Sequence, residues 1–187
     1  MVTTKLSLAD YLSLDYGPEG RCEFVDGDII EMPPESPRNV LISMFLIQQF
    51  LAHLPFYWLR RADTEIIVSG RTRIPDVMVL GEDLAIALES SGRSTIMEEM
   101  PPPLLVVEVV SPGKINEDRD YRYKRSEYAA RGIPEYWIVD PAQAKITMLT
   151  LVDGWYEPEV LGIDSFLQSP QFPDLRLSVA QVLSPKS

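Results

Sequence analysis

Two acidic side chains stand in apolar stretches of this sequence, where a carboxylate needs a partner. Glu108 lies in the middle of the aliphatic run LLVVEVV at 104–110, which is typical of a strand buried on both faces of a sheet. Asp76 follows Pro75 and opens a second apolar stretch at 77–80. Because an ionised carboxylate is costly to remove from water, each acid requires a cation or a proton. Hard divalent cations prefer carboxylate oxygens, so the pair predicts a metal site.

Each acid also has a simpler interpretation. Asp76 could cap the turn that follows Pro75, and Glu108 could form a structural salt bridge with a buried arginine. Glu23, which precedes the turn Asp26-Gly27, is a candidate third carboxylate or a solvated hairpin residue. The residue types alone leave these alternatives open.

A lysine follows Glu108 at a spacing that could bring it to the acids. Asp120, Lys124 and Tyr128 recur every four residues, which places them along one stripe of a helix. If that helix packs beside the Glu108 strand, Lys124 could direct its ammonium group at the carboxylates, with Asp120 and Tyr128 holding it in place. A lysine there could orient a water and offset charge on an attacked phosphodiester. The alternative is an Asp–Lys pair on the surface, which stabilises a helix by only about 0.5 kcal/mol.

The composition bounds the kind of protein and the kind of metal site. The chain has 187 residues, and we expect one domain over 1–187. One cysteine, Cys22, excludes an internal disulfide and favours the cytoplasm. One histidine, His53, together with that cysteine excludes a Cys/His zinc site, so oxygen must be the main metal ligand.

Charge and hydropathy address the partners. The longest apolar helical stretch, 40–52, contains Gln48 and Gln49 and is too short to span a bilayer, so no membrane association is expected. The net charge of −11 argues against nucleic acid. However, segments 60–73 and 114–131 hold ten of the 17 basic residues and only six acids. A basic surface there would suit a polyanion; the alternative is ordinary solvated charge.

The hydrophobic pattern predicts an α/β fold in which helices pack on a mixed sheet. Helices are expected at about 8–14, 39–54 and 116–131, and strands at about 23–25, 28–30, 57–61, 65–68, 74–80, 104–110, 135–139, 145–152 and 155–161. Residues 81–103 show no firm period and are predicted to form an irregular insertion. Asp26-Gly27 and Asp153-Gly154 predict two hairpins.

Five motifs then occur in a fixed order along the chain. They are EFVDG at 23–27, RIPD at 73–76, VEVVSP at 107–112, Lys124 with Tyr128, and GIPEYWIVD at 132–140. This ordered set resembles the Uma family of endonucleases, within the PD-(D/E)XK or restriction-endonuclease-like superfamily. The resemblance covers about residues 5–180.

The resemblance implies a fold, a reaction and a set of site residues. It implies a restriction-endonuclease-like αβββαβ core, with an N-terminal β-hairpin and a C-terminal β-hairpin extension. It implies cleavage of phosphodiester bonds of nucleic acid, more in keeping with DNA than RNA, by a Mg²⁺-dependent (or Mn²⁺-dependent) endonuclease that forms a homodimer. Asp76 and Glu108 would be metal ligands, Lys124 the catalytic lysine, Glu23 an auxiliary acid and Tyr128 a further catalytic-site residue.

Two positions depart from the pattern. The superfamily's usual lysine position holds Val110, and the family uses a lysine on the following helix instead, where Lys124 stands. A histidine commonly begins the first long helix of the family, and this chain has Asn39. The alternative functions are therefore a weakly active or inactive nuclease fold that binds nucleic acid or dimerises, and a metal phosphohydrolase that acts on small phosphate esters.

Overall fold

The computed structural model describes residues 5–14, 21–111 and 119–185. Its helices are α1 (Leu8–Leu12), α2 (Pro37–Leu51), α3 (Glu82–Glu89), α5 (Lys124–Ala130) and α6 (Val179–Leu183), with a 3₁₀ turn at Phe56–Trp58 and a π-helix at Arg119–Tyr123. Its strands are β1 (Cys22–Val25), β2 (Asp28–Glu31), β3 (Leu59–Arg60), β4 (Glu65–Val68), β5 (Arg71–Arg73), β6 (Val77–Val79), β7 (Thr95–Ile96), β8 (Leu105–Val109), β9 (Glu135–Asp140), β10 (Lys145–Val152) and β11 (Trp155–Gly162).

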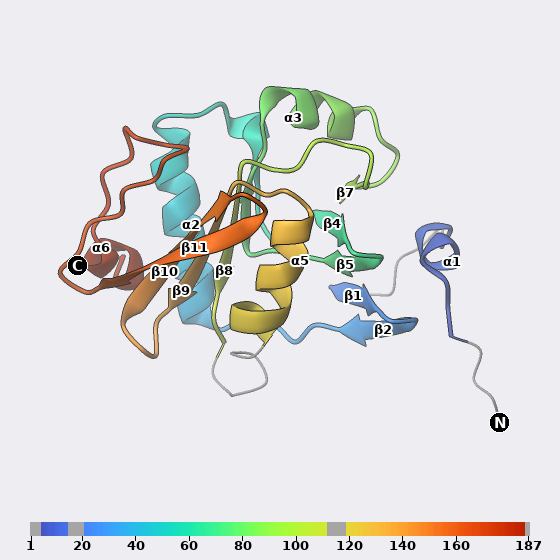
Figure 1. Cartoon of the computed structure of the whole chain (residues 1–187), viewed down its shortest axis with the longest axis horizontal. Coiled ribbons are helices and arrows are strands. Elements are labelled where there is room, and N and C mark those ends of the chain that lie inside the picture. Colours follow the sequence, from blue (N-terminus) through green and yellow to red (C-terminus); the bar gives the residue numbers. More distant parts are fainter. Residues whose placement is uncertain (1–4, 15–20, 112–118, 186–187) are drawn as a thin grey trace.

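A six-stranded sheet in the order β11-β10-β9-β8-β6-β3 forms the centre of the molecule. Strands β8 and β9 are parallel, and the other neighbouring pairs are antiparallel. Helix α2 lies on one face of this sheet and α5 on the other (Figure 1). The structure thus confirms the predicted α/β class with its mixed sheet and its two hairpin extensions.

The two faces of the central sheet follow the alternation of side chains along each strand. Odd-numbered residues of β6 and β8, such as Val107, pack with Leu46 and Phe50 of α2 in one apolar cluster. Even-numbered residues, such as Val106, pack with Tyr128 of α5 in the second cluster. Asp76 and Glu108 have even numbers, so the same alternation directs both acids to the α5 face.

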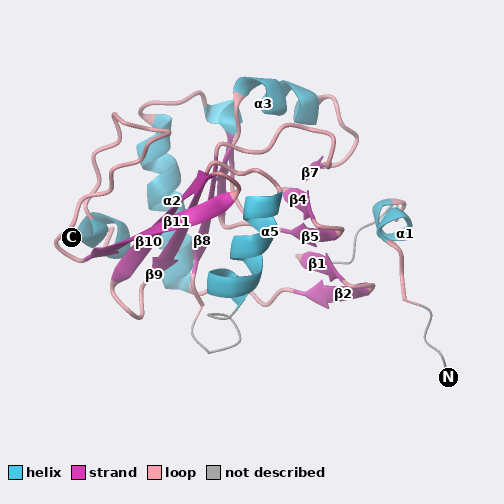
Figure 2. Ribbon diagram, viewed as in Figure 1, coloured by secondary structure: helices cyan, strands magenta, loops and turns pink. Residues whose placement is uncertain are grey.

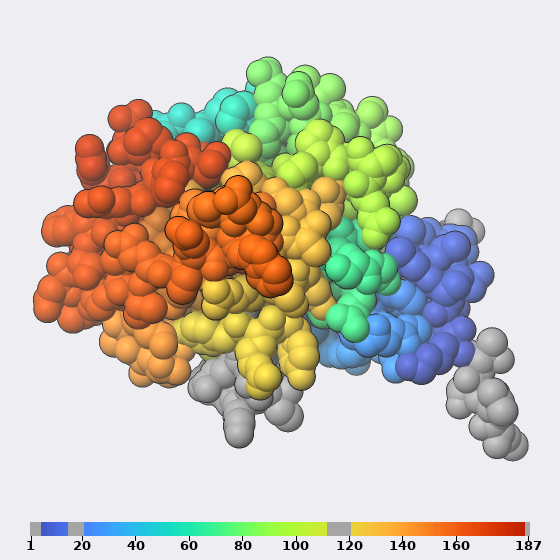
Figure 3. All heavy atoms as spheres, in the orientation of Figure 1, coloured from blue at the N-terminus to red at the C-terminus, as the bar shows by residue number. Residues whose placement is uncertain are grey.

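Two small sheets complete the α5 side of the molecule (Figure 2). Strands β1 and β2 form the hairpin predicted from Asp26-Gly27, and both turn residues have positive φ, 54° and 92°. Strands β5, β4 and β7 form the second sheet. The amide of Phe24 in β1 donates to Oγ1 of Thr72 in β5 at 2.8 Å, which joins the two sheets. They stand beside α5, opposite the β10–β11 hairpin (Figure 3).

The prediction of an irregular insertion at residues 81–103 was wrong. Helix α3 begins after Gly81, has Glu82 and Asp83 in its first turn, and buries Leu84 and Leu88 one turn apart. Strand β7 then pairs in parallel with β4. Helix α3 is short, so few residues show its helical hydrophobic period. The two residues of β7 form a strand because they pair with β4, and they are too few to show a pattern of their own.

Other helices and strands begin or end at residues that differ from the predicted ones, for physical reasons. Helix α2 begins at Pro37, because the Ser36 side chain caps it by accepting from the amide of Asn39. The expected strand at 57–61 is preceded by the 3₁₀ turn and shortens to β3. The predicted start of the helix at 116 lies outside the described residues. No helix in the described part of the chain is long and apolar enough to cross a membrane. One domain over residues 1–187 stays a prediction.

Candidate active site

Asp76 and Glu108 meet across neighbouring strands. Strands β6 and β8 pair Val77 with Val107, and continuing this antiparallel register by one residue places Asp76 opposite Glu108. The carboxylate Oδ2 of Asp76 accepts the main-chain N–H of Val109 at 2.6 Å, which fixes the acid against the next strand. Asp76 is 8% exposed and Glu108 is 4% exposed. Both acids are therefore buried side by side at one end of the strand pair.

Helix α5 supplies the cation beside Glu108. Nζ of Lys124 lies 2.8 Å from Oε1 of Glu108, and the hydroxyl of Tyr128 donates to the same oxygen at 2.7 Å. Lys124 is 1% exposed, so the interpretation as a surface pair is wrong. The one-turn spacing of Lys124 and Tyr128 brings both to one carboxylate, as a helical stripe requires. Burial, and then the charge of Glu108, raises the pKa of Tyr128 well above its ordinary value, which keeps the hydroxyl a donor.

The stripe differs in two ways from the expectation. Tyr128 binds the carboxylate of Glu108 as Lys124 does, instead of only steadying the lysine. The backbone from Arg119 to Tyr123 is a π-helix, which changes the register between Asp120 and Lys124. The Asp120 side chain lies outside the described residues, as does Lys114.

A small cavity of about 70 Å³ joins these groups. Its lining includes Asp76, Glu108 and Lys124, together with Arg21, Met32, Pro33, Pro34, Glu35, Asn39, Ile74, Val109 and Ser111. Burial raises the pKa of Asp76 to about 6, although the Val109 hydrogen bond and the charge of Lys124 act in the opposite direction. Among the described residues, no cation forms an ion pair with Asp76. The cavity is thus short of positive charge at this acid.

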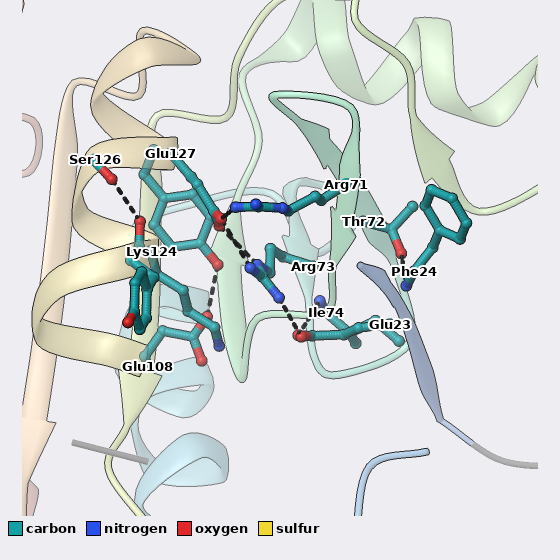
Figure 4. A network of polar contacts seen from close by, with 12 residues as sticks. Glu23, Phe24, Arg71, Thr72, Arg73, Ile74, Glu108, Lys124, Ser126 and Glu127 are labelled. Atoms are coloured by element: carbon teal, nitrogen blue, oxygen red, sulfur yellow. Dashed lines mark hydrogen bonds and ion pairs between the residues drawn. The ribbon is translucent and has the colours of Figure 1, made fainter. Parts of the chain in front are cut away.

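Glu23 is held in a different group of charges. Its Oε2 accepts from Nη1 of Arg73 at 2.8 Å, and its Oε1 accepts the amide of Ile74 at 3.3 Å. Arg73 also donates twice to Glu127 of α5, at 2.7 and 2.8 Å. Arg71 completes the network with a 2.7 Å bond to Glu127 (Figure 4). These contacts join strands β1 and β5 to the helix that carries Lys124.

The environment of Glu23 decides between its two sequence interpretations. At 2% exposed it is not a solvated hairpin residue. Burial opposes its ionisation, but the charges of Lys124 and Arg73 lower its pKa below the ordinary value. Glu23 is absent from the lining of the 70 Å³ cavity and lines a neighbouring one with Arg71, Arg73 and Tyr123. A role for Glu23 as an auxiliary acid stays a prediction.

Asn39, at the family's histidine position, binds the backbone beyond Glu108. Its Nδ2 donates to the carbonyl oxygen of Val109 at 3.1 Å and to Oγ of Ser111 at 3.3 Å. The residue is 4% exposed and lies in the first turn of α2. It therefore connects α2 to the end of β8, next to both acids.

Much of the basic charge in segments 60–73 and 114–131 is bound within the chain. Arg61, Arg71 and Arg73 form ion pairs, and Arg73 is buried. Arg125 donates to the carbonyl of Tyr156, and Arg131 donates to the carbonyls of Met97 and Met100. The ion pairs offset part of this positive charge, and the carbonyl contacts hold Arg125 and Arg131 against the backbone, so one continuous basic surface stays a prediction.

Sequence reasoning missed four charged residues of this region: Arg21, Glu35, Arg73 and Glu127. Arg73 carried a usable signal, because it stands in the motif RIPD, three positions before Asp76. Glu127 lies on the same helical face as Lys124 and Tyr128. Glu35 lies in a proline-rich loop, which gives no periodic signal for its position.

Comparison with known proteins assigns the chain to a family. The model of the family Uma2, described as "Putative restriction endonuclease", matches residues 8–180. Among solved structures, the chain resembles the crystal structure of a putative nuclease belonging to DUF820 from Anabaena variabilis ATCC 29413. The two share 19% sequence identity and a TM-score of 0.72, with 96% of this chain and 98% of that chain covered.

This structural likeness, at such low identity, shows the fold alone. A search of the curated proteins finds no match. The match over residues 8–180 covers most of the sequence, including Glu23, Asp76, Glu108, Lys124 and Tyr128. The chain belongs to the Uma2 family of restriction-endonuclease-type proteins.

Proposed function

We propose that this protein hydrolyses phosphodiester bonds of nucleic acid with the help of Mg²⁺ or Mn²⁺. The observation that carries the proposal is the pair of buried acids that line one cavity, Asp76 directly before β6 and Glu108 in β8, with Lys124 bound to Glu108. A purely structural salt bridge would need one acid for one lysine. The second acid, Asp76, has no ion-pair partner among the described residues.

The donor set suits a hard cation that keeps part of its water shell. No group of three or more His, Cys, Asp or Glu side chains that could hold a metal occurs in the described part of the chain. Mg²⁺ is commonly held by one or two carboxylates, with waters and substrate phosphates as its other ligands. Asp76 and Glu108 would be those carboxylates. When bound, the metal supplies Lewis acidity toward a phosphoryl oxygen and acidifies a water.

The residues of the chain have separate tasks in this proposal. Lys124 forms an ion pair with Glu108 and offers an ammonium proton donor within the cavity, where it can orient a nucleophilic water. Tyr128 fixes the direction of the same carboxylate. The amide of Val109 holds Asp76, and Asn39 holds the carbonyl side of Val109. These two bonds attach Asp76 to β8 and β8 to α2.

The substrate and the assembly are further parts of the proposal. We infer DNA in preference to RNA, and a homodimer that would address both strands of a duplex. The buried free thiol of Cys22 is compatible with a reducing compartment such as the cytoplasm.

The decisive experiment is a metal-dependent cleavage assay on supercoiled plasmid, single-stranded DNA and RNA, with small phosphate esters in parallel. We expect cleavage of DNA with Mg²⁺ or Mn²⁺, none with chelator, and none by Asp76→Ala. Asp76→Asn is the matched control, because its amide oxygen can still accept from Val109 and only the charge is lost. Calorimetry should show Mg²⁺ binding by the wild type and much weaker binding by both variants. Mg²⁺ binding without cleavage of any nucleic acid would favour an inactive binding module, and turnover of small esters alone would favour a phosphohydrolase.

A further inference from the structure

Two arginines bind one glutamate at the edge of the 70 Å³ cavity. Oε1 of Glu35 accepts from Nη1 of Arg21, and Oε2 of Glu35 lies 2.7 Å from Nη2 of Arg61. Arg21 precedes β1, Glu35 lies between β2 and α2, and Arg61 follows β3. With two positive charges and one negative charge, this Arg21–Glu35–Arg61 group carries a net charge of +1.

The group stands beside the acids of the proposed active site. Arg21 and Glu35 line the 70 Å³ cavity together with Asp76, Glu108 and Lys124. The charges of Glu35 and Arg21 also act on the ionisation of Asp76, in opposite directions. The arginine side chains are 27% and 29% exposed, so part of each can be reached from solvent.

Both arginines have hydrogen-bonding capacity that the chain does not satisfy. Nε of Arg21 and Nε of Arg61 are buried and find no hydrogen-bond acceptor in the described part of the structure. Buried N–H groups almost always have an acceptor. Arg73 shows the usual situation, because its Nε, Nη1 and Nη2 all donate to carboxylates. Because these two Nε atoms are closed off from solvent, an acceptor from outside the protein would contact the exposed part of each arginine side chain instead.

The chemistry of that acceptor follows from the donors. A guanidinium presents several N–H groups in one plane and matches the oxygens of a phosphate or carboxylate. Glu35 binds both guanidinium groups and so holds them close together, within reach of one anion. An anion with several oxygens uses them best, and a nucleic-acid strand offers a phosphate at every nucleotide.

A larger cavity adjoins the 70 Å³ cavity at Arg21. It has a volume of about 370 Å³, and Arg21 and Ile74 belong to the lining of both cavities. Its other lining residues include Arg93 and the acids Asp63 and Glu65, and Arg93 forms an ion pair with Glu65. A strand that places one phosphate beside Asp76 and Glu108 could therefore continue past Arg21 into the larger cavity.

We propose that Arg21 and Arg61 bind an internal phosphate of the substrate strand, next to the phosphate that is cleaved. The inference rests on the proposed nuclease function, since the strand is its substrate. Glu35 holds the two guanidinium groups together in the free protein. When the strand binds, the phosphate oxygens contact the exposed parts of the two arginine side chains.

The test measures binding separately from cleavage. A fluorescently labelled DNA strand is titrated against protein carrying Asp76→Asn, so that cleavage cannot interfere, and anisotropy is followed over a range of salt concentrations. Arg61→Gln should weaken binding roughly fivefold or more at low salt. For single-stranded DNA it should also lower the slope of log K against log salt by about 0.7, the value for one lost phosphate contact.

Arg60→Gln is the matched control. It removes the same charge one residue earlier, and Nη1 of Arg60 donates to the main-chain carbonyls of Tyr57 and Leu59 instead of Glu35. We expect less than a twofold change in binding for this variant. Equal effects of Arg60→Gln and Arg61→Gln would overturn the proposal, because general electrostatic attraction would then explain both.

Glu35→Gln separates a binding role from a structural one. If the arginines bind phosphate, removing the negative charge should tighten DNA binding severalfold. If the Arg21–Glu35–Arg61 group only joins three loops, Glu35→Gln should loosen the group and either weaken DNA binding or leave it unchanged. Either result would contradict the proposal. Arg61→Lys shows whether the planar fork matters: a folded Arg61→Lys protein should bind more weakly than the Asp76→Asn parent.

Two further arms complete the design. DNA with and without a 5′-phosphate should bind equally well; a dependence of the Arg61 effect on that terminal phosphate would overturn the assignment to an internal phosphate. If the wild type cleaves no nucleic acid but Arg61→Gln still lowers the salt slope, the nuclease function fails while the phosphate site remains. If the wild type cleaves DNA and the salt slope does not change, only the phosphate site fails.

Discussion

Two buried groups of charges lie on the α5 side of the sheet, and they differ in how completely they are paired. In the network of Glu23, Arg71, Arg73 and Glu127, Arg73 contacts Glu23 and Glu127. Arg71 contacts Glu127 and also Asp26 at the β1–β2 turn. Each acid is therefore bound by at least one arginine. In the carboxylate pocket of Asp76, Glu108 and Lys124, the lysine pairs with Glu108, and Asp76 has no ion-pair partner among the described residues. Helix α5 contributes to both groups, through Glu127 to the first and Lys124 to the second.

The difference separates a structural role from a ligand-binding role. A buried ion pair in which every charge is bound keeps its partners in one arrangement, and removing one partner is strongly destabilising. A buried acid without a cation destabilises the free protein and gains from binding one. The same type of residue, a carboxylate under 10% exposed, therefore has opposite effects on stability in Glu23 and Asp76.

The largest expected effect concerns Lys124, the cation that pairs with Glu108 in the pocket. Lys124→Ala should reduce cleavage by roughly 10²–10⁴-fold, the range for losing a proton-transfer group. Single-turnover cleavage of plasmid DNA measures it. Lys114→Ala, at a residue outside the described part of the chain, should cost far less. An active Lys124→Ala protein beside an inactive Lys114→Ala protein would show that the wrong lysine was chosen.

The second effect concerns the fully paired network. Arg73→Gln should lower the free energy of unfolding by about 3–5 kcal/mol, because two buried carboxylates lose their shared cation. Urea denaturation followed by circular dichroism measures this. Arg71→Gln is the control, since its side chain is 30% exposed and an exposed pair contributes about 1 kcal/mol or less. If the two variants lose equal stability, burial and complete pairing do not distinguish this network.

The third effect has the opposite sign and sharpens the comparison directly. Asp76→Asn should stabilise the metal-free protein at neutral pH by up to about 3 kcal/mol, because burial raises the pKa of Asp76 from 3.8 to about 6. Urea denaturation in chelator compares the two proteins. Adding Mg²⁺ should then stabilise the wild type and leave Asp76→Asn almost unchanged. A destabilised Asp76→Asn protein would mean that the acid is structurally needed.

The same pair of proteins gives a pH dependence with a definite direction. The folded-state pKa of Asp76 lies above its unfolded value, so its contribution to stability is complete below about pH 4. That contribution is lost as the pH rises through about 6. The wild type should therefore lose stability relative to Asp76→Asn between about pH 4 and pH 7, and the difference should vanish in acid. A difference that does not change with pH would contradict the assigned cause.

The smallest effect concerns Tyr128, which shares Oε1 of Glu108 with Lys124. Tyr128→Phe should cost about 1 kcal/mol of stability, because Lys124 still binds the same oxygen, and it should slow cleavage. Tyr156→Phe is a matched control, since its hydroxyl donates to the main-chain carbonyl of Ile133 at 2.7 Å, away from the pocket. It should lose similar stability without a change in cleavage rate. Equal loss of cleavage in both variants would remove Tyr128 from the site.

Local patterns in the sequence were sufficient for the elements that carry the pocket. The run around Glu108 predicted a buried strand, and the structure buries all five residues of β8. The four-residue spacing predicted that Lys124 and Tyr128 share a helical face, and both reach Glu108. Each of these inferences depends on residues close together in the chain, where helix and strand periods determine the geometry.

The paired network could not be predicted in this way. Arg73 and Glu127 are 54 positions apart, and no local period relates them. Glu35 lies in a loop whose prolines show irregular backbone but give no direction for a side chain. Helix α3 was missed because only eight residues carry its pattern. Contacts between distant segments depend on how the small sheets pack beside α5, which the sequence pattern does not determine.

The hydrogen bond from the Val109 amide to Asp76 makes one backbone proton a sensor of the pocket. This N–H points at Oδ2 of Asp76 from 2.6 Å, so its electron distribution changes whenever that carboxylate gains a proton or a positive ion. In ¹⁵N-labelled protein, the Val109 resonance should move with the charge of Asp76. Occupancy of the pocket could then be followed by NMR spectroscopy at a single peptide group, with neither substrate nor turnover.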